Sequence, residues 1–416
     1  MARRNNWRSS QYRGSRRSGG GVILAVFLLL AFLAVIGVLV RTFLIHPEPE
    51  GNQPFESSSQ PELSEQTTQE TVPESEPEPS PALPQMPESV RGIYISGPMA
   101  GSAAMGGLLS LIDETELNAV VIDLKNDDGY LTYLSASGTA AEIGACMPYI
   151  QDMPELVAEL KSHGIYTIAR VVAFKDPVLA KARPELTLHD ANGVPISESG
   201  VLSWVNPYEK DVWAYLEEIA LDAAELGFDE VQFDYVRFPA GSSSQIDYGA
   251  AGAGVEKTDA IAGFLTEVTA LLHEKGAYSS ADVFGTIITN PADAEYVGQD
   301  FVQLAQIVDK ICPMVYPSHY AADSFGLAVP DSQPYETVHS ALAYASSALF
   351  GFETERANCV RPWLQDFTAT WVAGHITYGP EELRAQTKAV YDAGYTDWLL
   401  WNAGNQYTAD GLEPSA

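Results

Sequence analysis

From residue 89 onward, short apolar runs alternate with longer amphipathic stretches. The short runs are rich in β-branched and aromatic residues and predict eight strands, at 91–96, 119–125, 166–174, 230–238, 281–288, 309–316, 360–367 and 398–403. Apolar residues recur with helical spacing at 105–115, 154–163, 208–226, 258–275, 335–350 and 380–393, and more weakly at 300–308. Strands that alternate with helices in this way are typical of a parallel sheet.

Eight such units in residues 89–416 predict a (β/α)8 TIM barrel of the α/β class. The tail after residue 403 is too short and too rich in turn residues for an eighth helix. We therefore expect the barrel either to lack that helix or to be capped by another segment, such as the one near residue 89. An open doubly wound sheet is the alternative, but SGPMAGSAAMGG after the first strand does not match the GxGxxG pattern of such folds.

Residues 22–40, VILAVFLLLAFLAVIGVLV, form a run of nineteen residues without a charge. At 1.5 Å per residue such a run crosses a hydrocarbon core of about 30 Å, so we expect a single transmembrane helix. Six arginines precede it and only Arg41 closely follows it, which predicts a cytoplasmic N-terminus and an extracytoplasmic remainder. A cleaved signal peptide is the alternative, but the run is longer than usual and no small-x-small cleavage site follows.

The segment between the apolar run and the barrel is rich in proline and glutamate. Residues 47–88 hold ten glutamates and ten prolines, with no lysine or arginine. Because such a chain repels itself and has little to bury, it predicts a disordered, extended stalk. The predicted organisation is a basic cytoplasmic tip (1–21), a transmembrane helix (22–40), a stalk (41–88) and a barrel domain (89–416).

The charge of the chain excludes one class of function, and its motifs argue against others. With 55 acidic and 23 basic residues the formal net charge is -32, which repels phosphate backbones and argues against nucleic-acid binding. The three cysteines form no CxxC pair, the histidines show no HExxH spacing, and no glycine-rich phosphate loop occurs. We therefore expect no metal site and no cofactor. The sequence does not indicate an oligomeric state.

In a barrel of this type the chemistry lies at the carboxyl ends of the strands. The polar and aromatic residues expected there are Asp123, Lys125, Arg170, Asp234, Arg237, Tyr316, His319, Arg361, Trp363, Gln365, Trp401 and Asn402. Period-two alternation places Asp123 and Lys125 on one side of their strand, and Arg361 and Gln365 on one side of theirs. Carboxylates combined with amides, hydroxyls and aromatic rings form a suitable site for a polyol such as a sugar.

Structural roles are the alternative for these residues. The charged ones could form a buried ion network that fixes the strand register, with Arg361 in a salt bridge to one of the acids. Both tryptophans could be core packing, and His319 an ordinary loop residue. The convergence of so many suitable groups at one rim favours a site.

Several segments of the barrel domain together resemble one known family. They are RGIYIS (91–96), VVIDLKNDDG (120–129), QFDYVRFP (232–239), PMVYPSHY (313–320), RPWLQDF (361–367) and GYTDWLLWNAGNQY (394–407). Over residues 90–407 the chain is similar to glycoside hydrolase-like domains of bacterial surface proteins. These are described as TIM barrels related to glycosidase superfamilies, without a firmly assigned substrate. The resemblance implies a glycosidase-type barrel.

The resemblance also implies a role for Asp234. Many related barrels carry the nucleophile or base as a carboxylate at the end of the fourth strand, and Asp234 matches that placement. They often carry a glutamate at the end of the fifth strand, whereas here that strand is predicted to end at Thr289 and Asn290. We therefore expect Asp123 to be the second carboxylate and general acid. The other candidates for this role are Asp293, Glu295 and Asp366.

The expected function is hydrolysis of an O-glycosidic bond in a polysaccharide or oligosaccharide near the cell surface, by a membrane-anchored enzyme. Asp234 and Asp123 would be catalytic, and the other ten residues at the strand ends would bind substrate. The main alternative is a non-catalytic barrel that binds glycan or a cell-wall partner without cleaving it, which the missing glutamate on the fifth strand favours. A polysaccharide deacetylase or lyase is a weaker third possibility.

Overall fold

The computed structural model describes residues 82–135, 138–198, 201–202, 204–240, 246–352 and 358–415. Within these ranges no helix combines the length and the apolar character needed to cross a membrane. The predicted span at 22–40 lies outside the described residues, as do the basic tip before it and most of the stalk after it.

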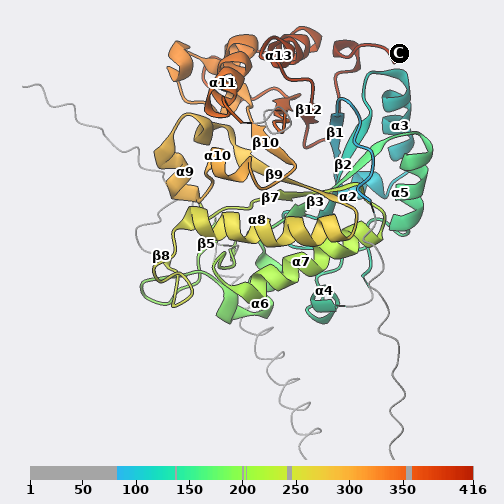
Figure 1. Cartoon of the computed structure of the whole chain (residues 1–416). Helices are drawn as coiled ribbons and strands as arrows, with labels where there is room; N and C mark the ends of the chain where they lie inside the picture. The colour runs from blue at the N-terminus through green and yellow to red at the C-terminus, as the bar shows by residue number, and fades with distance from the viewer. Residues whose placement is uncertain are drawn as a thin grey trace, which may run out of the picture. The chain divides into compact units, whose positions relative to one another are not determined.

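Eight parallel strands close into a barrel in the order β1-β12-β11-β10-β9-β7-β3-β2 (Figure 1). They are β1 (Arg91–Ile95), β2 (Ala119–Lys125), β3 (Tyr166–Val172), β7 (Glu230–Asp234), β9 (Tyr278–Phe284), β10 (Lys310–Met314), β11 (Trp363–Gln365) and β12 (Trp398–Trp401). Each of the eight predicted runs contains or overlaps one of these strands. The closed barrel confirms the predicted (β/α)8 fold and excludes the open sheet.

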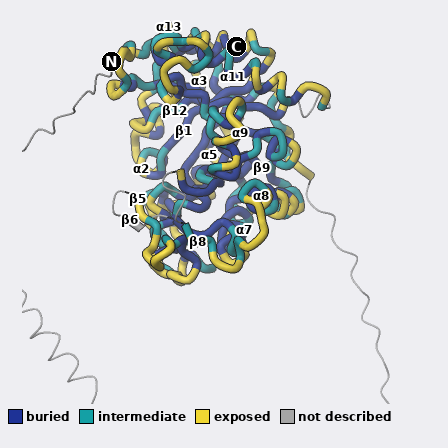
Figure 2. The backbone as a smooth tube through the Cα atoms, turned by 90° about the vertical axis from the view of Figure 1, so that its left-hand side faces the viewer, coloured by how far each residue is buried: buried dark blue, intermediate teal, exposed yellow. Residues whose placement is uncertain are grey.

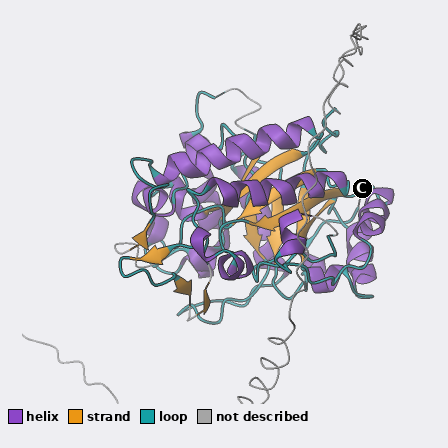
Figure 3. Cartoon of the chain, turned by 90° about the horizontal axis from the view of Figure 1, so that it is seen from below, coloured by secondary structure: helices purple, strands orange, loops and turns teal. Residues whose placement is uncertain are grey.

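Helices surround the strands, which lie at the centre of the view in Figure 3. The six long ones each match a predicted helix to within two residues: α3 (Met105–Glu114), α5 (Met153–Ser162), α7 (Lys210–Glu225), α8 (Lys257–Glu274), α11 (Pro334–Ala348) and α13 (Pro380–Asp392). The short ones are α2 (Gly97–Ala100), α4 (Gly138–Glu142), α6 (Pro177–Ala182), α9 (Pro291–Val297) and α10 (Phe301–Leu304). The last of these falls in the weak candidate at 300–308.

Short 3-10 turns and strands lie within the loops. The 3-10 turns are η1 (Pro184–Leu186), η3 (Gly285–Ile288), η4 (Pro317–His319), η5 (Ser324–Gly326), η6 (Pro330–Ser332) and η7 (Ala409–Gly411). Two antiparallel strand pairs are β4 (His189–Asp190) with β8 (Ile246–Asp247), and β5 (Ser197–Glu198) with β6 (Val201–Leu202).

The helix α5 illustrates how local sequence sets the boundaries of these elements. The carboxylate of Asp152 accepts a hydrogen bond of 2.9 Å from the backbone N–H of Glu155, which caps the first turn. Pro154 occupies that turn, where it has no hydrogen bond to lose. Beyond the helix, Gly164 adopts φ +74°, a left-handed conformation that glycine takes without strain.

Buried side chains form two layers, because successive residues of a strand point to opposite faces. One cluster fills the inside of the barrel and includes Val121, Ile168, Trp363 and Leu399. A larger cluster, which includes Ile122, lies between the strands and the surrounding helices. In Figure 2 the barrel strands run as dark blue, buried segments, with the exposed yellow segments outside them. The inner layer is the one that can present side chains to a site at the barrel mouth.

The two ends of the domain close the barrel in different ways. At the amino ends of the strands, Met86 packs against the inner cluster, and the hydroxyl of Tyr278 donates to the carbonyl of Pro84 at 3.0 Å. The segment before residue 89 therefore covers that opening. After β12 no α-helix follows within the described residues up to 415, as expected; instead Leu412 is buried, and the N–H of Glu116 donates to the carbonyl of Glu413 at 2.8 Å.

Candidate active site

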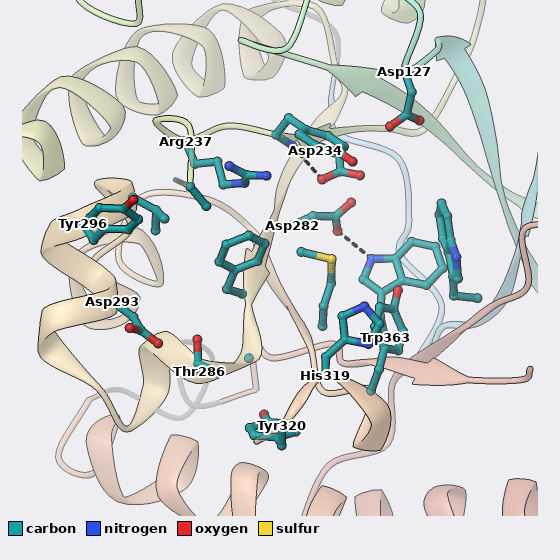
Figure 4. Close-up of a pocket in the computed structure, with 18 of the residues that line it drawn as sticks. Asp127, Asp234, Arg237, Asp282, Thr286, Asp293, Tyr296, His319, Tyr320 and Trp363 are labelled. Atoms are coloured by element: carbon teal, nitrogen blue, oxygen red, sulfur yellow. Dashed lines mark hydrogen bonds between the residues drawn. The ribbon is translucent and has the colours of Figure 1, made fainter. Parts of the chain in front are cut away.

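A cavity of about 520 Å³ opens at the carboxyl ends of β7, β9, β10, β11 and β12 (Figure 4). This is the end of a (β/α)8 barrel at which active sites form. Of the twelve residues that the sequence placed at the rim, seven line the cavity: Arg170, Asp234, Arg237, Tyr316, His319, Trp363 and Trp401. More than half of the residues expected at the strand ends therefore meet at one cavity, and the other five lie elsewhere.

Asp234 is the last residue of β7 and faces the cavity. Its Oδ1 accepts a hydrogen bond of 2.6 Å from the backbone N–H of Tyr235, and its Oδ2 accepts from Nε and Nη2 of Arg170 at 3.0 and 2.6 Å. Tyr235 has φ +50°, a left-handed conformation that is unfavourable for a residue with a side chain. The chain therefore turns sharply and unfavourably directly after the Asp234 carboxylate.

Arg170, on β3, gathers three carboxylates around one guanidinium. Besides Asp234, its Nη1 donates to Oδ1 of Asp123 at 2.6 Å, and its Nη2 donates to Oδ2 of Asp127 at 3.1 Å. The rings of Tyr94 and Trp401 lie 5.7 and 5.4 Å from its Cζ atom. The guanidinium is fully buried, so this network of charged hydrogen bonds holds it in a fixed position beside Asp234.

Asp123 does not line the cavity, contrary to its expected role as the second catalytic carboxylate. Both of its oxygens are engaged, Oδ1 by Arg170 and Oδ2 by the hydroxyl of Tyr94 at 2.6 Å. Burial raises the pKa of Asp123, and the charge of Arg170 opposes that rise. The structure therefore gives Asp123 the role of a support for Arg170.

Asp282, on β9, is the carboxylate that the sequence analysis missed. It lines the cavity, although the residue as a whole is only 2% exposed, and its Oδ1 accepts a hydrogen bond of 2.6 Å from Nε1 of Trp363. Burial and then the charge of Asp234 raise the pKa of Asp282 well above its ordinary value. Asp282 therefore holds its proton more tightly than an ordinary aspartic acid does.

A misplaced strand boundary hid Asp282. The fifth strand was predicted at 281–288, so its carboxyl end was sought at Thr289 and Asn290. The strand in fact ends at Phe284, and Gly285–Ile288 forms the 3-10 turn η3. An acidic residue inside the apolar run SADVFGTII was the available signal, because a buried charge is costly unless it is paired or functional.

Aromatic rings form one wall of the cavity. The rings of Tyr94 and Trp401 stack with centroids 4.2 Å apart, and Trp401 meets Trp363 edge to face at 5.6 Å. Tyr316 packs edge to face against His319 at 5.1 Å. Such rings can cover the apolar face of a sugar while the carboxylates address its oxygens.

The rest of the lining carries groups that the sequence analysis did not place at the strand ends. They are Asp127, Phe284, Thr286, Asp293, Tyr296 and Tyr320, among others. Asp293 had been considered as a general acid, and it reaches the cavity from α9. The guanidinium of Arg237 lies over the ring of Phe284, and its Cζ atom is 4.6 Å from the ring centroid. Within the described residues, no group of three His, Cys, Asp or Glu side chains could hold a metal ion.

Lys125 and Arg361 were expected to bind substrate, but each is part of a buried ion pair outside the cavity. Nζ of Lys125 lies 2.9 Å from Oδ2 of Asp176. The strand register shifts between Asp123 and Lys125, which breaks the alternation that was expected to keep the two side chains on one side. Arg361 pairs with both oxygens of Glu230 at the opposite end of the barrel interior. The structural interpretation considered for Arg361, a salt bridge to an acid, is therefore the one observed.

Gln365 and Asn402 were also expected at the rim, and both instead hold loops in place. The side chain of Gln365 is fully buried; its Nε2 donates to Asp331 at 3.0 Å and its Oε1 accepts from the N–H of Ser318 at 3.1 Å. Asn402 donates from Nδ2 to the carbonyls of Asp366 and Gln406, at 2.6 and 2.7 Å. The polar groups of both side chains form hydrogen bonds within the protein. These bonds account for a polar residue at each position, and no contact with substrate is needed to explain it.

Comparisons with known proteins agree with this architecture. A sequence family described as "Putative glycosyl hydrolase domain" matches residues 92–407, whereas a comparison with curated proteins gives no match. Among solved structures, the glycoside hydrolase domain of PgaB (BpsB) from Bordetella bronchiseptica is similar with a TM-score of 0.61 and 14% identity, covering 79% of this chain and 100% of that one.

Two further structures are similar over part of their length or part of this chain. The β-galactosidase from the psychrophilic Marinomonas ef1 has a TM-score of 0.51 and 12% identity over 78% of this chain and 56% of its own. A hypothetical protein from Ruminiclostridium thermocellum ATCC 27405 is 38% identical, over 46% of this chain and 97% of that one, with a TM-score of 0.43. Because the PgaB domain and the galactosidase share only 14% and 12% identity with this chain, their similarity shows the fold alone.

The family match carries the identification, because it spans nearly the whole barrel domain and includes both Asp234 and Asp282. The chain belongs to this family of glycosyl hydrolase domains, enzymes that hydrolyse glycosidic bonds.

Proposed function

We propose that the barrel cleaves a polysaccharide with Asp234 as the nucleophile and Asp282 as the general acid. The observation that carries this proposal is a pair of carboxyl groups in contrasting surroundings within one cavity. Asp234 accepts two hydrogen bonds from the guanidinium of Arg170, whereas burial raises the pKa of Asp282 well above its ordinary value. Environments that separate two carboxyl groups in this way are how glycosidases assign the base and the acid.

The strand register brings the two side chains together. β7 and β9 are paired neighbours whose last paired residues are Phe233 and Ala281, so Asp234 and Asp282 both follow at the next position. Neighbouring strands lie about 4.8 Å apart, and the two residues occupy the inward-facing positions. Of the two routes open to a carboxylate pair, we propose the retaining one, in which the carboxylate of Asp234 attacks the sugar directly.

In the proposed first step, the carboxylate of Asp234 attacks the anomeric carbon while Asp282 gives its proton to the departing glycosidic oxygen. The bond from carbon to that oxygen breaks, and an ester bond from carbon to Asp234 forms. In the second step, Asp282, now ionised, takes a proton from water, whose oxygen attacks the same carbon and releases Asp234. Trp363, Trp401 and Tyr316 would hold the sugar ring during both steps.

The cellular setting follows from the sequence and is also a proposal. An uncleaved helix at 22–40 would anchor the chain, and the proline- and glutamate-rich stalk would carry the barrel away from the membrane on its outer side. Residues 89–416 hold 45 acidic and 16 basic residues, so strongly anionic polymers would be repelled unless the charge is locally offset. We therefore propose a cell-surface polysaccharide of low negative charge as substrate.

The non-catalytic alternative loses its main support. That interpretation was favoured by the missing glutamate at the end of the fifth strand, and Asp282 supplies a carboxyl group from that strand.

The proposal is tested by the Asp234→Asn variant, assayed for reducing ends released from a panel of neutral and amino-sugar polysaccharides. The amide cannot act as a nucleophile, so turnover should fall by about 10⁴-fold while the thermal unfolding curve stays cooperative. Asp259→Asn is the matched control, because Asp259 is exposed on α8 and does not line the cavity. Full activity of Asp234→Asn on a polysaccharide that the wild type cleaves would refute the assignment.

A further inference from the structure

A second cavity of about 450 Å³ adjoins the active-site cavity and extends it. The two share four lining residues, Thr286, Asp293, His319 and Tyr320, so they lie directly next to each other. We call the second cavity the outer groove. A groove that continues beyond the reacting carboxylates offers space for more of the substrate than the single sugar at the cleavage point.

Like the wall of the active-site cavity, the outer groove combines aromatic rings with polar side chains. Phe325 and Tyr344 present stacked rings, with centroids 6.1 Å apart and planes inclined by 29°, and Tyr344 is 54% exposed. The lining also includes the polar residues Thr289, Asn290 and Ser324. Aromatic faces next to hydroxyl and amide groups match the alternating apolar and polar surface of a sugar chain.

The backbone holds the aromatic part of the groove in an unfavourable conformation. Phe325 has φ +55° and Asp323 has φ +68°, both left-handed values that cost energy for residues with a side chain. The ring of Phe325 is further fixed by that of Tyr320, 5.1 Å away. A loop that keeps this geometry presents the ring of Phe325 as a preformed surface.

The outer groove lies to one side of the two carboxyl groups. Asp234 ends β7 and Asp282 lies on β9, while the outer groove is built from segments that follow β9 and β10, farther along the same strand order. In Figure 4, Asp127 and Asp234 lie at one side of the cavity and Thr286, His319 and Tyr320 at the other, with Asp282 between them. The groove therefore lies beyond the proton donor.

A general acid protonates the oxygen of the leaving group, so the leaving group extends past the acid. We infer that the outer groove binds the sugar units on the leaving-group side of the scissile bond, and thus that the substrate is a chain that continues on that side. This inference rests on the roles proposed for Asp234 and Asp282. The described lining contains Asp293 and no lysine or arginine, which fits neutral or amino sugars and not uronic acids or phosphate-bearing units.

The Tyr344→Ala variant tests the inference through two kinds of probe. The first are 4-nitrophenyl glycosides of glucose, galactose and N-acetylglucosamine in both anomeric forms, whose leaving group is a single aromatic ring and not a chain of sugars. The second are linear β-1,4-linked oligomers of glucose and of N-acetylglucosamine, of increasing length. Loss of one stacking ring should reduce kcat/KM for the longer oligomers about 3- to 10-fold and leave the aryl glycosides within about twofold of wild type.

Two further variants make the result specific. Tyr344→Phe keeps the ring and should restore cleavage of the long oligomers. Phe350→Ala removes a side chain that is 90% exposed just after α11 and outside both cavities, so it should leave every probe unchanged.

The outcomes separate the inference from the proposed function. If the wild type cleaves none of the probes or polysaccharides, or if Asp234→Asn remains active, the proposed function fails and the inference falls with it. If Asp234→Asn is inactive but Tyr344→Ala cleaves long oligomers as well as the wild type does, the inference alone is overturned. An equal loss on aryl glycosides and oligomers would overturn it too, because the effect would then not depend on the leaving-group side.

Discussion

Asp282→Asn is the substitution that tests the division of labour between the two carboxyl groups. Asparagine has nearly the same shape as a protonated aspartic acid, and its side-chain oxygen can still accept the hydrogen bond that Nε1 of Trp363 donates at 2.6 Å. The side chain is buried and lines the cavity, so little rearrangement is expected. What the variant lacks is a proton that it can transfer.

The expected loss is that of a general acid, about 10²- to 10⁴-fold in turnover, or about 3 to 5 kcal/mol in the activation barrier. The loss should depend on the leaving group. A 2,4-dinitrophenolate departs without being protonated, so hydrolysis of a 2,4-dinitrophenyl glycoside should fall by about tenfold or less. A natural polysaccharide, whose leaving group is an alcohol, should show the full effect.

The pH profile provides the second readout. The wild type needs Asp234 ionised and Asp282 protonated, so its kcat/KM should follow a bell-shaped curve that declines on the alkaline side as Asp282 loses its proton. Asp282→Asn should lose that alkaline decline. Equal losses on dinitrophenyl glycosides and polysaccharides, or an alkaline decline that persists in the variant, would refute the assignment of Asp282 as the acid.

The same substitution has a predictable effect on stability. Because the pKa of Asp282 is raised in the folded chain, the folded state holds this proton over a pH range in which the unfolded state has released it. The free energy of unfolding therefore falls as pH rises through that range, and the loss is absent below the ordinary aspartate pKa of about 3.9. Asp282→Asn should unfold at a higher temperature than the wild type near neutral pH, and the difference should shrink as the pH approaches 4.

Two other predictions concern residues around this pair. Trp363→Phe removes the hydrogen bond that lowers the pKa of Asp282, so the alkaline decline of activity should move to higher pH; a move to lower pH would contradict the proposed contact. Arg361→Met leaves Glu230 buried without its cation, which should cost about 3 to 5 kcal/mol of unfolding free energy in a urea titration. Because this ion pair lies outside the cavity, the activity of the folded variant at low temperature should match wild type, and a selective loss of activity would assign Arg361 to the site after all.

Periodicity in the sequence was enough to predict the barrel, because each strand and helix must bury an apolar face with its own repeat. It could not fix where the fifth strand ends, because SADVFGTII stays apolar through both the strand and the 3-10 turn after it. That boundary decided whether Asp282 or Asn290 would be read as the residue at the carboxyl end. A shift of a few residues was therefore enough to hide a carboxylate of the site.

The sequence by itself determined the eight strands and placed Asp234 at the carboxyl end of the fourth, since these depend on local pattern and on the geometry common to parallel barrels. Only the tertiary structure decided which polar residues at strand positions face the cavity. Lys125 was turned away by a bulge, Arg361 was matched to Glu230 at the far end of the barrel, and Asp282 was brought beside Asp234 by the pairing of β7 with β9. Such choices depend on contacts between residues far apart in the chain, and no local pattern records them.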